Sequence, residues 1–148
     1  MSLYHRSRRA EILLVEDSPA DVRLVTEALQ RCSIPHHLTA IDNGWEALKF
    51  LHREAPYATA PRPDLIVLDL NLPGLSGREL LTAIRQEPAL QHLVVVMLTS
   101  SASPQDVYTL YQIPVNCFIT KPFEIERFFL VIRTLVEFWL GMATVPEN

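Results

Sequence analysis

Glycine is scarce in this chain, with only four among its 148 residues. Many nucleotide-binding sheets carry a glycine-rich phosphate loop, G-x-G-x-x-G or G-x-x-x-x-G-K-[ST], and neither sequence occurs here. The composition therefore argues against a flavin- or nucleotide-binding protein. A flavin absorbance in the purified protein would reverse that exclusion.

Cysteine is rarer still, and long hydrophobic runs are missing. Cys32 and Cys117 are the only cysteines and no C-x-x-C spacing occurs, so we expect both to be reduced, buried thiols. The longest apolar runs, such as Leu93 to Leu98, are far shorter than the roughly 20 residues of a membrane-spanning helix. No signal-length apolar segment follows the basic N-terminus, and we therefore expect a cytoplasmic protein that does not enter a membrane.

The chain also lacks an excess of positive charge. Its net charge is -4, which argues against nucleic acid or an anionic membrane surface as the main partner. Hydrophobic residues make up 49% and charged residues 20%, a balance typical of a folded globular protein. The length suits a single domain over residues 1–148, which we divide into an N-terminal arm (1–9), a core (10–140) and a C-terminal tail (141–148).

The most informative stretch runs from Pro63 to Gly77, PDLIVLDLNLPGLSG. Its apolar run, 65–68, is typical of a buried strand, although the pattern alone does not separate a strand from a buried helical piece. Asp69 follows the run and is itself followed by turn-forming residues. We therefore expect Asp69 at the carboxyl end of a central strand, where open α/β sheets bind ligands. The alternative is that Asp69 only caps the next helix or turn.

Strand and helix patterns alternate five times along the chain. We expect strands at 11–15, 37–41, 65–68, 93–98 and 115–119, and helices at 20–31, 45–51, 78–85, 103–110 and 124–140. This alternation predicts an α/β fold, a five-stranded parallel sheet with helices on both faces. In such a sheet the carboxyl ends of all strands lie at one edge.

Polar side chains follow four of the five expected strands. Glu16 and Asp17 follow the first strand, Asp69 the third, Thr99 the fourth and Lys121 the fifth. Crowded carboxylates repel one another, and a divalent cation such as Mg²⁺ relieves that repulsion while accepting phosphate oxygens. A hydroxyl and an ammonium at the same edge suit the remaining phosphoryl oxygens. The set is therefore suited to forming an acyl phosphate on Asp69, although each group alone is also typical of a cap or a surface turn.

The sequence resembles the receiver domain of two-component response regulators over nearly its whole length. The matching segments are LLVEDSP, DLIVLDLNLPGLSG, MLTSS and FITKPF. The resemblance implies a flavodoxin-like, doubly wound (βα)5 fold, a histidine kinase as phosphodonor, and bound Mg²⁺ or Mn²⁺. It also implies a signalling protein, not an enzyme beyond its own phosphorylation and dephosphorylation.

The resemblance further implies roles for individual residues, with Asp69 as the phosphoacceptor. The metal ligands would be Glu16, Asp17, Asp69 and the backbone carbonyl of Asn71, and the phosphoryl contacts Thr99, Ser100 and Lys121. Many family members have aspartate at the position of Glu16, and the longer side chain changes how a metal would be held. The Lys121–Pro122 peptide bond is expected to be cis, as in other members.

A conformational switch is also implied by the resemblance. Phe118 matches the aromatic residue that turns inward when the hydroxyl of Thr99 moves toward a phosphoryl group. Physically, a local change of charge would bias an element with two states. The alternative is that Phe118 is a permanent core aromatic.

The expected last helix is apolar around more of its surface than one buried face needs. Its apolar residues cover roughly 200°, against the about 100° of a single core-facing stripe. A second apolar face predicts a homodimer, and related receivers often pair through their fourth helix, fifth strand and fifth helix. The expected contacts are Phe128, Phe129, Val131, Phe138 and Trp139. The alternative is that the N-terminal arm or the tail, 142–146, folds over this face.

Two further segments, VNCFITKPF and EFWLGMATVPEN, are similar to the small receivers that partner phytochrome-type histidine kinases in cyanobacteria. The resemblance implies such a kinase as the partner. Because the sequence ends at Asn148, we expect a stand-alone regulator without a DNA-binding or enzymatic output domain. The main alternative is an aspartate-nucleophile phosphatase, but that class has a second acid two residues after the nucleophile, where this chain has Asn71.

Overall fold

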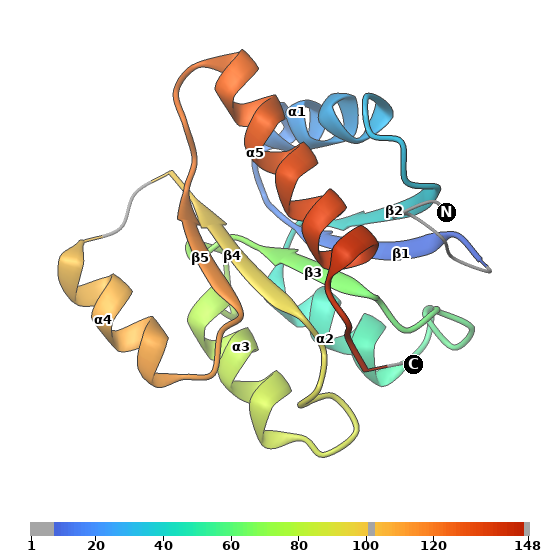
Figure 1. Ribbon diagram of the computed structural model, residues 1–148. Coiled ribbons are helices and arrows are strands. Elements are labelled where there is room, and N and C mark those ends of the chain that lie inside the picture. Colours follow the sequence, from blue (N-terminus) through green and yellow to red (C-terminus); the bar gives the residue numbers. More distant parts are fainter. Residues whose placement is uncertain (1–7, 101–102, 147–148) are drawn as a thin grey trace.

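Five parallel strands form the centre of the molecule (Figure 1). The computed structural model describes residues 8–100 and 103–146. The strands are β1 (Ala10–Val15), β2 (His36–Ile41), β3 (Leu65–Leu68), β4 (Val95–Thr99) and β5 (Cys117–Thr120), in the order β2-β1-β3-β4-β5. All neighbouring strands are parallel. The predicted parallel α/β sheet is confirmed, and β3 lies at its middle.

Helices cover both faces of this sheet (Figure 1). They are α1 (Pro19–Gln30), α2 (Gly44–His52), α3 (Gly77–Gln86), α4 (Pro104–Gln112) and α5 (Ile125–Glu137), and a π-helical turn, η1 (Phe138–Met142), follows α5. Helices α1 and α5 pack on one face, and α2 and α3 on the other, with Leu110 of α4 in the same core as α2 and α3. None of the helices within the described residues has the length and apolar character that crossing a bilayer requires.

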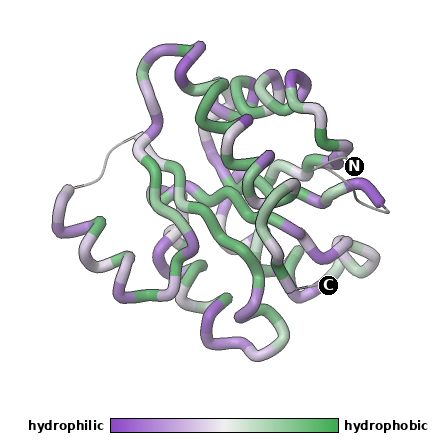
Figure 2. Tube along the Cα trace, in the orientation of Figure 1, coloured by the Kyte–Doolittle hydropathy of each residue, from purple (hydrophilic) through white to green (hydrophobic). Residues whose placement is uncertain are grey.

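The two cores follow from the alternation of side chains along each strand. In β1, Ile12 and Leu14 pack toward α1 and α5, whereas Leu13 and Val15 pack toward α2 and α3. All four residues of β3 are buried, as expected for a strand covered on both faces. Figure 2 shows the apolar residues running along the strands between the helices. Both cysteines are free thiols that are half-buried against the α1 and α5 core, and not fully buried as predicted.

Each of the first four helices begins at a side-chain cap. Ser18 accepts a hydrogen bond from the third residue of α1, and Asn43 does the same for α2. Ser76 and Ser103 form full capping boxes at α3 and α4. Because these caps satisfy backbone donors that the helices leave open, they fix where the chain turns after β1, β2, β3 and β4.

Two of the five predicted dimer contacts lie in the core, so the prediction for them is wrong. Phe128 and Phe129 are 3% and 6% exposed and pack with α1 and the sheet. They belong to the stripe of α5 that faces the sheet, which the width of an apolar arc does not identify. Val131 and Trp139 are half-buried, whereas Phe138 is 48% exposed. Val145 of the tail packs against the same core, and residues 1–7 of the arm lie outside the described residues. The alternative that the tail or the arm covers the second apolar face stays a prediction.

Gly77, the first residue of α3, lies against the backbone carbonyl of Asp69. A Cβ atom at position 77 would lie 2.0 Å from that carbonyl oxygen, far inside van der Waals contact. The backbone N–H of Gly77 also donates a hydrogen bond to the Leu70 carbonyl at 3.0 Å. The approach of α3 to the loop after β3 therefore requires a residue without a side chain.

We expect Gly77→Ala to lower the free energy of unfolding by about 3 kcal/mol, because the added methyl group must displace the backbone at Asp69. Urea unfolding followed by circular dichroism measures this change. Arg78→Ala alters the exposed next residue of the same helical turn and should cost less than about 0.5 kcal/mol. Equal stabilities for the two variants would contradict the proposed role of the close contact.

Candidate phosphoacceptor site

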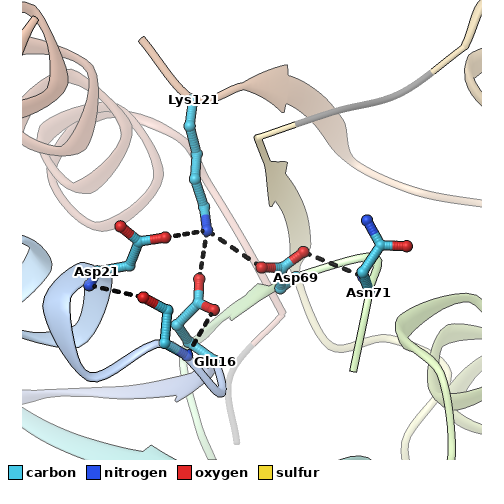
Figure 3. Close-up of polar contacts among 6 residues, drawn as sticks. Glu16, Asp21, Asp69, Asn71 and Lys121 are labelled. Atoms are coloured by element: carbon cyan, nitrogen blue, oxygen red, sulfur yellow. Dashed lines mark hydrogen bonds and ion pairs between the residues drawn. The ribbon is translucent and has the colours of Figure 1, made fainter. Parts of the chain in front are cut away.

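The carboxyl ends of β1, β3 and β5 bring the predicted site residues to one edge of the sheet (Figure 3). Backbone hydrogen bonds hold two of them beside the neighbouring strand. The N–H of Asp69 donates to the Val15 carbonyl at 3.0 Å, and the N–H of Lys121 donates to the Thr99 carbonyl at 2.7 Å. Sheet pairing therefore continues to the residues that follow the strands and fixes where their side chains begin.

The ammonium group of Lys121 lies among three carboxylates (Figure 3). Its Nζ atom is 2.5 Å from Oε1 of Glu16, 2.7 Å from Oδ2 of Asp21 and 3.1 Å from Oδ2 of Asp69. The Lys121 side chain is 6% exposed, and a charge so far from solvent needs opposite charges around it. Its three N–H donors match the three carboxylates.

Burial and charge change the ionisation of two groups in this cluster. Burial raises the pKa of Glu16 to about 7; the hydrogen bond from Lys121 opposes this change, and the charge of Asp69 adds to it. Burial alone would lower the pKa of Lys121, but its hydrogen bonds to Asp21 and Glu16 and the charges of Glu16 and Asp69 raise it above the usual lysine range. Lys121 is therefore a permanent cation, whereas Glu16 changes charge near neutral pH.

Three carboxylates form a candidate metal cluster at the same edge. One oxygen each from Glu16, Asp17 and Asp69 lies within 4.8 Å of the others. Glu16 and Asp69 are buried and Asp17 is exposed, so a cation among them would keep access to water. Hard carboxylate oxygens with space for water are the ligands that Mg²⁺ and Mn²⁺ take. The residues present therefore fit a divalent cation.

The loop after β3 folds back onto Asp69 (Figure 3). The N–H of Asn71 donates to Oδ1 of Asp69 at 3.1 Å, which leaves Oδ2 facing Lys121. This bond fixes the carboxylate plane and brings the Asn71 backbone next to the acidic cluster. The role of the Asn71 carbonyl as a metal ligand stays a prediction.

The predicted switch residues lie along β4 and β5. Thr99 is fully buried at the end of β4, and Ser100 after it is exposed, while Ser101 lies outside the described residues. Phe118 is half-buried and packs against the core on the α2 and α3 side, beside Met97 of β4. These positions agree equally with a switch aromatic and with a permanent core residue, so the switch stays a prediction.

The peptide bond between Lys121 and Pro122 is not cis, and that prediction is wrong. Within the described part of the chain, the cis peptide bond lies between Ala55 and Pro56. For a bond before proline the trans form is favoured by about 0.5–1 kcal/mol unless tertiary contacts select the other isomer. In the trans form Lys121 already reaches its three carboxylates.

Asp21 is the residue of this cluster that the sequence analysis missed. It is the third residue of α1, where an acidic residue is ordinary because it stabilises a helix N-terminus. The sequence Ser18-Pro-Ala-Asp21 has the spacing of a capping box, in which the acid would accept from the N–H of the serine. That N–H instead donates to Oε2 of Glu16 at 3.2 Å, and the Asp21 carboxylate contacts Lys121. This exchange of hydrogen-bond partners between Glu16 and Asp21 is visible only in the folded structure.

Residues 12–133 match the response regulator receiver domain family, and this chain is a member of that family. The match covers most of β1, all of β2 to β5 and most of α5. The aspartate-nucleophile phosphatases are therefore not favoured.

Among response regulators, the chain is similar to small cyanobacterial proteins of phytochrome signalling. The chain is 44% identical over 135 residues to "Response regulator Rcp1" of Synechocystis sp. (strain ATCC 27184 / PCC 6803 / Kazusa), an alignment that covers 91% of this chain and 92% of that protein. The phosphorylated cyanobacterial phytochrome response regulator RcpA has a similar structure, with a TM-score of 0.91 and 43% identity over 95% of this chain and 100% of that one. The Mn²⁺-bound form of Rcp1 matches with a TM-score of 0.88 and 43% identity over 93% and 99% of the two chains.

We expect the affinity for Mn²⁺ or Mg²⁺ to fall as the pH is lowered from 8 to 6. With a pKa of about 7, Glu16 is mostly protonated at pH 6, and a metal must displace that proton, whereas at pH 8 it is ionised. One such proton predicts a dissociation constant about tenfold larger at pH 6, measurable by titration calorimetry. The Glu16→Gln variant has no titrating group at this position. It should bind the metal more weakly than the wild type, and its affinity should not show this pH dependence. A wild-type affinity that is equal at both pH values would contradict the coupling.

Proposed function

We propose that this response regulator accepts a phosphoryl group on Asp69 from the histidine of a sensor kinase. The observation that carries the proposal is the position of Asp69, buried after the central strand, with the Lys121 ammonium 3.1 Å from Oδ2 and two further acids beside it. A nucleophilic carboxylate, a fixed cation and acids that could hold a metal, all at one edge of the sheet, are the parts that phosphoryl transfer to a carboxylate needs.

The proposed transfer is a displacement at phosphorus. An oxygen of Asp69 forms the new P–O bond while the P–N bond to the kinase histidine breaks, and the imidazole leaves. Lys121 supplies positive charge to the phosphoryl oxygens, and Thr99 supplies a hydroxyl from the neighbouring strand. A bound Mg²⁺ would neutralise further charge on the phosphoryl oxygens, and Glu16, Asp17, Asp69 and the Asn71 carbonyl would hold it.

The proposed response is a change at β4 and β5. The acyl phosphate places more negative charge beside Thr99 and Lys121, which are already joined by a backbone hydrogen bond of 2.7 Å. Movement of the Thr99 side chain toward that charge would free space next to β5, and Phe118 of β5 would turn inward to fill it. The local charge change would thereby bias a surface that partners contact.

The proposed kinase is of the phytochrome type. RcpA, with 43% identity over nearly the whole of both chains, is a cyanobacterial phytochrome response regulator. A structure described as a bacteriophytochrome response regulator, AtBRR, also matches, with a TM-score of 0.73 and 36% identity. We propose the cytoplasm as the site of this exchange and stand-alone phosphate relay as the role of the chain.

Asp69→Asn should abolish phosphorylation, because the amide is not a nucleophile toward phosphorus. Wild-type protein incubated with Mg²⁺ and ³²P-labelled acetyl phosphate should gain an acid-stable, base-labile label, and a phosphorylated phytochrome-type kinase should give the same product faster. Asp42→Asn, at an exposed position after β2, is the control and should be labelled like the wild type. Label retained by the Asp69 variant would refute the assignment of the acceptor.

The alternative of a phosphatase activity has its own measurement. Release of p-nitrophenol from p-nitrophenyl phosphate over many turnovers would show an enzyme. A response regulator instead gives at most one phosphoryl group per chain, followed by slow hydrolysis.

We also propose a homodimer through α4, β5 and α5, with the contact face revised from the sequence prediction. An apolar groove of about 620 Å³ lies between β5 and α5, and its apolar lining includes Ile119, Leu130, Val131, Phe138 and Trp139. Leu130 and Phe138 are 52% and 48% exposed. Two tyrosines of α4, Tyr108 and Tyr111, add exposed aromatic surface at 69% and 56%. An isologous contact would bury this face against its copy.

Leu130→Asp should shift the protein toward monomer, because a carboxylate in the centre of the proposed contact would lose its water. Multi-angle light scattering with and without beryllofluoride measures the mass and its dependence on the phosphorylated-like state. Ala58→Asp places the same charge in the exposed loop after α2 and should leave the mass unchanged. A wild-type monomer in both conditions would rule out the dimer while leaving the acceptor site in place.

A further inference from the structure

Asp21 contacts Lys121 more closely than the phosphoacceptor does. The distance from Nζ of Lys121 is 2.7 Å to Oδ2 of Asp21 and 3.1 Å to Oδ2 of Asp69. Asp21 lies on α1, 100 residues away in the chain, and its side chain is 27% exposed. The contact therefore joins the start of α1 to the turn after β5.

The Asp21 carboxylate is available for this contact because another acid has taken its usual role. The N–H of Ser18, which a capping-box acid would accept, donates to Oε2 of Glu16 at 3.2 Å. Ser18 in turn accepts the backbone N–H of Asp21 through its hydroxyl at 3.3 Å. These two bonds fix the backbone of Asp21 and leave its carboxylate directed at Lys121 (Figure 3).

Asp21 also differs from the other two partners of Lys121 in its relation to the metal cluster. Glu16 and Asp69 belong to the set whose oxygens lie within 4.8 Å of one another, together with Asp17, and Asp21 does not belong to it. A cation in that set would draw the charge of Glu16 and Asp69 away from the lysine. Asp21 would then be the carboxylate that still pairs with the Lys121 ammonium.

We propose that Asp21 is a positioning residue that holds the Lys121 ammonium at the site while Glu16 and Asp69 serve the metal and the phosphoryl group. This inference rests on the proposed function. A lysine side chain is flexible, and an ammonium without a fixed partner spreads over many rotamers. A charge-assisted hydrogen bond from a rigid helix start keeps Nζ within reach of an incoming phosphoryl oxygen.

The mobility of Lys121 can be observed directly, because Lys49 is the only other lysine of the chain and lies on the surface. Protein carrying [¹³Cε]lysine should give two signals. In the wild type with saturating Mg²⁺, Lys121 should show two inequivalent ε protons and a shift distinct from Lys49. In Asp21→Asn with saturating Mg²⁺ the Lys121 signal should average toward that of Lys49. Without Mg²⁺ the same variant should keep Lys121 fixed, since Glu16 and Asp69 still hold it.

Phosphorylation rates give a second readout. With saturating Mg²⁺ and acetyl phosphate, Asp21→Asn should slow labelling about tenfold, since a charged hydrogen-bond partner becomes neutral. Asp21→Glu, which keeps the charge, should restore much of the rate. Lys121→Gln should be slower still, and the double variant with Asp21→Asn should be no slower than Lys121→Gln alone. Glu27→Gln removes one charge from an exposed position of the same helix and is the matched control.

Two results would overturn the proposal. The first is a Lys121 signal that stays fixed in Asp21→Asn with saturating Mg²⁺. The second is a double variant whose loss is the product of the two single losses, because Asp21 would then act on the metal or substrate without Lys121. If the NMR signals change as expected but the wild type takes no label, the positioning role stands and the proposed function fails.

Discussion

A buried ammonium between carboxylates is the interaction on which this edge of the sheet depends. Glu16 and Asp69 have side chains that are 3% and 8% exposed, and without Lys121 their charges would meet in a poorly solvated space. Lys121 offsets only part of the free-energy cost of burying these charges. The remaining cost is seen in Glu16, whose pKa burial raises to about 7 despite the hydrogen bond from Lys121. The site is thus stable with one internal cation and is suited to receive a second, hydrated one beside Asp17.

The strand order explains why a lysine, and not a shorter residue, follows β5. In the order β2-β1-β3-β4-β5, β4 separates the start of Lys121 from Asp69, and β3 and β4 separate it from Glu16. Only a long side chain spans that distance. Its apolar stem can run over the ends of the intervening strands while its charged end reaches the carboxylates. Thr99, at the end of β4, accepts the backbone N–H of Lys121 through its carbonyl.

The site could be predicted from the sequence because several strand ends together carry polar residues, although each of these residues alone is also typical of a cap or a turn. Asp69 and Thr99 directly follow apolar runs and Lys121 follows one after Thr120, so parallel strands place all three at the same edge of the sheet, whatever the details of the helices. Asp21 could not be found this way, because an acid in the first turn of a helix already has a sufficient local reason. Phe128 and Phe129 were assigned to a dimer because a helical wheel gives the width of an apolar arc and not its orientation. The isomer before Pro122 depends on tertiary contacts that no local pattern encodes.

If Asp69 carries a phosphoryl group as proposed, that group would have two connections to the rest of the fold. The first would be the proposed switch through Thr99 and β5. The second is the contact of Lys121 with Asp21 at the start of α1. The far end of that helix packs against α5, where the guanidinium of Arg31, the residue after α1, lies 4.2 Å from the ring centre of Phe129 and 3.6 Å from Glu126. A phosphoryl charge on Asp69 would change the strength of the ion pairs that Lys121 makes with its three carboxylates. Asp21 is the one of these three that does not belong to the candidate metal cluster. Helix α1 is therefore joined to the site by the same ammonium that would stabilise the phosphoryl group, and α5 packs in the same core as that helix.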